Sequence, residues 1–141
     1  MDMPSNQVDI HKAGGILIRD RRILVGRTRG KSSFIAPGGS LEVGETSQES
    51  LVRELMEEFD IYVNESDLEM LDTFYADAAE QPDKKIQMDV FLVKSWKGDP
   101  KPSSEVEEMR WINTFDARAL TVGSIIEHNV LPLLKNRGLI D

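Results

Sequence analysis

The feature that most constrains this chain is a glycine-rich loop that leads directly into an acidic helix, at residues 38–61. The loop starts at Gly38-Gly39. The helix starts at a capping box, Thr46-x-x-Glu49, in which the threonine hydroxyl accepts a hydrogen bond from a free helix amide and the glutamate accepts one from the amide of the cap. The pattern predicts that the helix ends near Phe59-Asp60, before the β-branched Ile61.

This predicted helix has two chemically different sides. Glu54, Glu57 and Glu58 are expected on one side, and an apolar face on the other. As a solvated face the three glutamates are ordinary, but at positions i, i+3 and i+4 they repel one another. A divalent cation would reverse that balance, because Mg²⁺ and Mn²⁺ prefer carboxylate oxygens. The expected apolar face consists of Val52, Leu55, Met56 and Phe59, with Leu51 at its edge.

Two neighbouring features can be interpreted structurally or functionally. Arg53 could be an ordinary surface arginine, could bridge to Glu45 and hold the loop on the helix, or could orient Glu54. Gly38-Gly39 could be a simple turn. Alternatively, the missing Cβ atoms let a metal ion or a phosphate approach the main chain, so that a carbonyl oxygen becomes a ligand.

Length and charge limit the functional classes. The 141 residues predict one domain over residues 1–141, and the formal charge of −8 argues against nucleic-acid or membrane partners. No apolar run approaches the roughly 18 residues of a membrane span. The absence of cysteine excludes thiolate metal sites and fits a reducing cytoplasm. The polar first residues, 1–7, predict no signal peptide, so a cytoplasmic location is expected.

The other elements alternate strands with helices and predict an α/β fold with a mixed sheet between helices. A second amphipathic helix is expected at residues 124–136, with Pro132 shifting its start or kinking it. The expected strand regions are a tight hairpin over residues 8–25, a short apolar segment at 34–36, a hairpin of strands 68–76 and 86–96 around a loop at 77–85, and a short strand at 109–112 after a loop at 97–104.

The stretch resembles the Nudix box, G-x5-E-x7-R-E-U-x-E-E-x-G-U, where U is a bulky aliphatic residue. Eight of its nine specified positions match over 23 residues. The departure is Asp60 in place of a glycine after the helix, where aspartate tolerates a left-handed backbone better than most residues. The matching residues are Gly39, Glu45, Arg53, Glu54, Leu55, Glu57, Glu58 and Ile61.

The resemblance implies an α/β/α sandwich and a hydrolase that cleaves a diphosphate linkage with Mg²⁺ or Mn²⁺. Glu54, Glu57, Glu58 and the carbonyl of Gly38 would bind metal. Arg53 and Glu45 would form a supporting salt bridge, with Arg53 counted in the catalytic machinery. Gly39 would lie at the substrate. The non-catalytic alternative is a nucleotide-binding or regulatory module, although such modules typically lose box glutamates.

Outside the box, the chain looks most like the MutT branch, which removes pyrophosphate from nucleoside triphosphates. Glu105 resembles the catalytic glutamate of its long loop, so Glu105 or Glu54 would be the general base. Asn129 resembles its purine-binding asparagine. The structural alternatives are a charged loop for Glu105 and a helix surface for Asn129. His11 is expected to be incidental.

The substrate implied is a small nucleotide such as 8-oxo-dGTP, handled by a monomer or homodimer. ADP-ribose and dinucleoside polyphosphates are alternatives. Relatives acting on these carry a proline or a tyrosine, respectively, at a set distance after the box. Pro82 and Tyr75 fall near those places without clearly matching either.

Overall fold

The strands form two sheets in a computed structural model, which describes residues 8–77 and 83–141. The first sheet is mixed, because β1 and β6 run parallel while the outer pairs are antiparallel. The second sheet is antiparallel. In order, the first contains β4 (Gly38–Ser40), β1 (Ile10–Ile16), β6 (Lys85–Val93) and β5 (Leu68–Asp77), and the second β2 (Ile18–Arg19), β3 (Arg22–Thr28) and β7 (Val106–Ile112).

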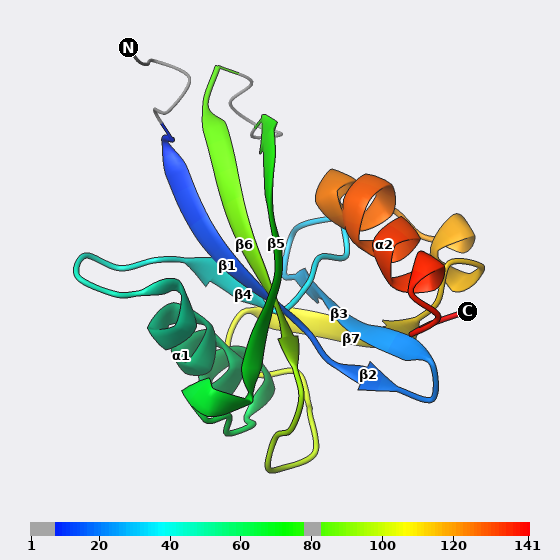
Figure 1. Cartoon of the computed structure of the whole chain (residues 1–141), viewed down its shortest axis with the longest axis horizontal. Helices are drawn as coiled ribbons and strands as arrows, with labels where there is room; N and C mark the ends of the chain where they lie inside the picture. Colours follow the sequence, from blue (N-terminus) through cyan, green and yellow to red (C-terminus); the bar gives the residue numbers. More distant parts are fainter. Residues whose placement is uncertain (1–7, 78–82) are drawn as a thin grey trace.

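Helices cover both sides of this strand layer (Figure 1), with α1 (Ser47–Phe59) on one side and α2 (Leu131–Asn136) on the other. Consecutive strand residues point to opposite faces, so each strand contributes to two cores. Val90 packs in the cluster that contains α2 residues, whereas the next residue, Phe91, packs in the cluster around α1. The predicted α/β/α sandwich with a mixed sheet is confirmed.

The predicted N-terminal hairpin forms, but its first strand, β2, is shorter than expected and its second, β3, is longer. Asp20 and Arg21 both adopt the left-handed conformation, with φ of 52° and 60°, which suits a two-residue hairpin turn. The turn joins β2 to β3 only. The expectation of one strand through residue 18 is therefore wrong. The chain passes from the first sheet to the second around the buried Leu17.

Other strand boundaries also shift. The strand expected to reach residue 96 ends at Val93, and the one expected from residue 109 begins at Val106. In the predicted loop 77–85, Asp77 and Lys85 are themselves paired strand residues, while 78–82 lie outside the described part. Among the described residues there are also three short helical segments, at Glu65–Asp67, Asp116–Ala119 and Ile126–Val130.

The second predicted helix forms with an irregular middle. Helical conformation starts at Ser124, and Ile126–Val130 is a wide π turn that leads into α2. The amide of Leu131 donates to the carbonyl of Ile126, five residues back. Pro132 brings no amide hydrogen and its ring needs room at the preceding turn. The expected disturbance at Pro132 therefore takes the form of a wide turn.

Both predicted ends of α1 are confirmed. Thr46 Oγ1 accepts from the amide of Glu49 over 3.1 Å, and Glu49 Oε1 accepts from the amide of Thr46 over 2.9 Å. At the other end Asp60 adopts φ 57°, ψ 40°, the left-handed cap conformation. Aspartate therefore does the structural work for which the family pattern has glycine.

The predicted buried face of α1 is wrong in its centre. Met56 is 44% exposed, and the buried apolar residues are Leu51, Leu55 and Phe59. The helix is thus turned so that Glu54 borders the buried stripe instead of lying opposite it, and the Glu54 side chain is only 15% exposed. The turn is possible because the neighbouring strand β4 offers glycine where a larger side chain would fill the space.

Candidate active site

Two carboxylates of α1 lie directly against the backbone of β4. The Gly38 amide donates a hydrogen bond to Glu58 Oε1 over 3.2 Å. At Gly39, an added Cβ would overlap the Glu54 carboxylate. Gly38 has φ 139°, and a Cβ there would collide with the carbonyl of Ala13. Glycine is therefore required at position 38, and at position 39 it leaves the Glu54 carboxylate in place, so that main chain and carboxylates lie together.

The negative charges of Glu54 and Glu58 are only partly balanced by nearby positive charges and hydrogen-bond donors. Burial, followed by the charge of Glu54, raises the pKa of Glu58 to about 7, against the opposing hydrogen bond from Gly38. Burial also raises the pKa of Glu54, although Arg53 acts in the opposite direction. Paired carboxylates that resist ionisation together are suited to a cation, because it would stabilise both charges.

Arg53 joins the loop to the helix. Its Nε and Nη2 donate to the two oxygens of Glu45 over 2.7 Å and 3.0 Å, a bidentate pair. The Arg53 hydrogen bond, followed by one from the Glu42 amide, lowers the pKa of Glu45 to about 2. Arg53 Nη1 also lies 3.2 Å from Glu57 and 3.5 Å from Glu54. Arg53 therefore bridges to Glu45 and also contacts the carboxylates of Glu54 and Glu57.

The predicted metal ligands are brought together only in part. Glu54, Glu58 and Gly38 are adjacent. Glu57 lies beside Glu54, whose pKa it helps to raise, but its side chain also faces Arg53 and is 47% exposed. Across residues 8–77 and 83–141, no three His, Cys, Asp or Glu side chains are arranged to hold a metal ion. The donor types still fit a hard cation, and Glu57 could join the pair by turning from Arg53.

The predicted catalytic loop lies against the end of α1. The amide of Ser103 donates to the carbonyl of Glu58 over 2.8 Å. Glu105 is exposed in the turn before β7, and its charge contributes to the raised pKa of Glu58. The fold therefore brings Glu105 near the α1 carboxylates, and its role as a base stays a prediction.

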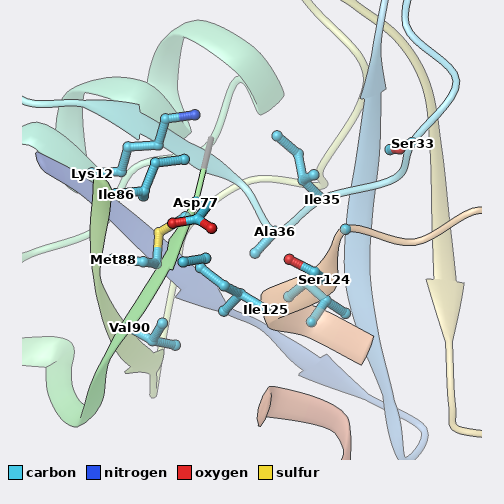
Figure 2. A pocket seen from close by; sticks show the side chains of 13 residues that line it. Lys12, Ser33, Ile35, Ala36, Asp77, Ile86, Met88, Val90, Ser124 and Ile125 are labelled. Atoms are coloured by element: carbon cyan, nitrogen blue, oxygen red, sulfur yellow. The ribbon is translucent and has the colours of Figure 1, made fainter. Parts of the chain in front are cut away.

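A cavity of about 200 Å³ opens on the α2 side of the first sheet (Figure 2). Its walls come from β1, β5, β6, the segment before β4 and residues 123–126. Ala36 lines both this cavity and a small hollow that Pro37 and Glu58 also line, so the cavity lies close to the start of the glycine strand. Asn129 is exposed and is not among the lining residues, so its base-binding role stays a prediction. The lining also includes Lys12, Asp77 and Ser124, which belong to none of the sequence motifs described above.

A second polar cluster, under the first turn of α1, was also missed. Asp89 is only 6% exposed, and one of its oxygens lies 2.6 Å from His11 Nε2 and accepts from Ser47 Oγ over 2.5 Å. Its other oxygen accepts from Thr73 and Gln87 over 2.9 Å and 3.1 Å. His11, expected to be incidental, thus belongs to a network drawn from β1, α1, β5 and β6. No local pattern predicts such a network, because its members are far apart in the sequence.

Comparisons with solved structures agree with the fold. The MutT protein of Methanosarcina mazei Go1 superposes with a TM-score of 0.75 at 17% identity, covering 94% of this chain and 97% of that one. The E. coli ORF135 protein superposes with a TM-score of 0.70 at 21% identity, covering 96% and 91%. In the described part of the chain, no helix is long and apolar enough to cross a membrane.

Sequence comparisons give the family. The NUDIX domain model matches residues 9–134. A Nudix hydrolase of Bacillus subtilis (strain 168), itself uncharacterized, is 26% identical over 125 residues, 89% of this chain and 79% of the relative. The 8-oxo-dGTP diphosphatase of Buchnera aphidicola is 29% identical over 126 residues, 88% and 95%. That of Proteus vulgaris is 44% identical over 63 residues, 45% and 52%. The chain therefore belongs to the Nudix family, resembles its MutT branch most, and is a Nudix hydrolase.

Proposed function

We propose that the protein hydrolyses a diphosphate linkage in a nucleotide with the help of Mg²⁺ or Mn²⁺. The observation that carries the proposal is the placement of Glu54 and Glu58 against Gly38-Gly39, next to the cavity. Carboxylates that border an open strand backbone and a cavity suit a metal-bound phosphate chain, with the organic moiety in the cavity. Metal ions also reconcile an acidic protein with an anionic substrate.

The metal would be held by Glu54, Glu58, the carbonyl of Gly38, and Glu57 once it turns from Arg53. When bound, it would neutralise phosphate charge and lower the pKa of water. Gly39 would lie at the substrate, because its missing side chain lets the Glu54 carboxylate lie against the strand where the metal-bound phosphate would be held.

A carboxylate of the chain would take the proton from the attacking water. Glu54 and Glu105 are the two candidates. Glu54 has a raised pKa and borders the glycine strand, and a higher pKa makes a carboxylate a better proton acceptor. Glu105 lies in the loop anchored to α1 by Ser103. Arg53 would hold the Glu45 loop in place against the helix during the reaction.

Within this class we favour a nucleoside triphosphate that releases pyrophosphate, of the 8-oxo-dGTP type. The similarity to 8-oxo-dGTP diphosphatases supports this choice. Tyr75, which would suggest a dinucleoside polyphosphate, is exposed on β5, and Pro82, which would suggest ADP-ribose, lies outside the described residues. A non-catalytic module is less consistent with a box that keeps all its glutamates.

A substrate panel tests the proposal. Nucleoside triphosphates, 8-oxo-dGTP, ADP-ribose and dinucleoside polyphosphates are incubated with Mg²⁺, with Mn²⁺ and with a chelator, and product release is followed. We expect metal-dependent hydrolysis, fastest with a nucleoside triphosphate. Equally slow turnover of every compound would place the natural substrate outside this panel, and no metal-dependent hydrolysis would contradict the proposed activity.

A further inference from the structure

Lys12 is a basic side chain that the site described so far does not use. It lies on β1 and lines the cavity (Figure 2), on the opposite face of the strand from Ala13, which packs in the core around α1. It is half-buried, and within the described ranges it forms no ion pair and no side-chain hydrogen bond. By contrast, Arg22, Arg27 and Arg53 each hold a carboxylate.

The cavity leaves the charge of Lys12 uncompensated. Among the described residues that line it, only Lys12 and Asp77 are charged. The Asp77 carboxylate is held by Lys85 Nζ at 2.6 Å. An anion close to this half-buried ammonium would stabilise its charge. No described residue of the chain therefore pairs with the Lys12 ammonium, which leaves it open to an anion supplied by a ligand.

The position of Lys12 indicates where that anion would lie. In the antiparallel pair of β1 and β4, Lys12 stands opposite Ser40, and Ala13 stands opposite Gly39. Opposed residues of such a pair have Cβ atoms only about 5 Å apart. Lys12 thus rises beside the strand that carries Gly38-Gly39. A ligand whose organic moiety fills the cavity, and whose phosphate chain reaches this strand, would run past Lys12.

We propose that Lys12 is a substrate-binding residue whose ammonium group binds the phosphate that adjoins the nucleoside. The inference rests on the proposed function. It assigns to Lys12 the part of the ligand that lies between the cavity and the metal-bound phosphates. A lysine is suited to the task, because its ammonium is a compact charge with three donors on a flexible stem. This role of Lys12 requires a ligand that carries a phosphate attached directly to the moiety in the cavity.

Binding measured without turnover tests this assignment. Calorimetry with Mg²⁺ compares deoxyguanosine monophosphate with deoxyguanosine, on the full chain and on Lys12→Met, which keeps the length of the side chain. Loss of a charged hydrogen bond should weaken binding of the monophosphate roughly ten- to hundredfold and leave binding of the nucleoside unchanged. Lys12→Arg should restore most of the affinity. Lys94→Met is the matched control. Lys94 is exposed just after the end of β6 and does not line the cavity.

Kinetics provide an independent readout. With the best substrate of the panel, Lys12→Met should raise KM by a similar factor and change kcat little. Unchanged monophosphate binding, equal weakening of nucleoside and monophosphate, or no monophosphate binding by the unaltered chain would each overturn the assignment. Failure of the proposed function is distinguishable, because it would show as an unaltered chain that hydrolyses nothing in the panel, whatever its binding.

Discussion

The amide of Gly38 donates a hydrogen bond to the carboxylate of Glu58 over 3.2 Å, and so joins β4 to the last turn of α1. This one amide does not offset the burial of the carboxylate, whose pKa stands at about 7. The metal-free protein therefore holds a group that is stable when protonated and unfavourable when charged. A carboxylate with so strongly raised a pKa is typical of a functional site.

Glu58→Gln should stabilise the metal-free protein at alkaline pH. The folded pKa of about 7 lies above the ordinary value of 4.5, so the folded state binds the extra proton and stability falls as pH rises between these values. Removing the charge should add about 1 to 3 kcal/mol at pH 8, and little at pH 4.5. Urea unfolding in chelator measures this. A variant less stable than the unaltered protein at pH 8 would refute the account of Glu58.

Glu45→Gln should loosen the loop from the helix and reduce turnover. The pKa of Glu45 is lowered to about 2, so its stabilising effect is present above 4.5 and is lost as pH falls toward 2. The difference in urea midpoint between variant and unaltered protein should shrink over that range. Turnover should fall roughly tenfold, as for other groups that orient ligands. Glu69→Gln, an exposed residue on β5, is the control. Equal turnover in both variants would argue against a supporting role for Glu45.

Gly39→Ala should impair activity more than stability. The added Cβ would displace the Glu54 carboxylate, a side chain able to move. Gly44→Ala, in the same loop, adds its Cβ in open space and at φ 86° pays only the strain of a left-handed backbone, about 1 kcal/mol. Parallel measurements of kcat and thermal unfolding separate the two effects. Similar loss of activity in both variants would show that contact with Glu54 is not what matters.

Asp89→Asn should destabilise the fold. Asparagine keeps the shape but turns two N–H donors toward a site where Ser47, Thr73 and Gln87 already donate. We expect a loss of about 1 to 3 kcal/mol in the free energy of unfolding, since charged hydrogen bonds are removed and a buried donor lacks an acceptor. Urea unfolding at pH 7 measures it, and an unchanged midpoint would mean that the cluster does not anchor α1.

Local patterns predicted the parts of the site that depend on local structure. The capping box at Thr46 follows from a short spacing, and the left-handed Asp60 and the pairing of Arg53 with Glu45 are implied by the family resemblance; all three form. The burial of Glu54 did not follow, because a helical wheel ranks glutamate as exposed. The burial of Glu54 depends on Gly39 in β4, and a helical wheel does not include residues of neighbouring elements.

Features assembled from distant segments could not be predicted in the same way. The network around Asp89 and the cavity beside Lys12 each combine several strands, and the sequence distance between partners reaches 78 residues for His11 and Asp89. The division of the first strand depends on which sheet each half joins, and alternation alone does not decide that.

The most direct test of the central claim is the turnover of Glu57→Gln with Mg²⁺, using the best substrate of the panel. Glu57 is 47% exposed, so the substitution should leave the fold intact, which circular dichroism and thermal unfolding verify. If the α1 carboxylates bind the catalytic metal, kcat should fall by orders of magnitude. Near-normal turnover in a folded Glu57→Gln protein would contradict the assignment of Glu57 as a metal ligand.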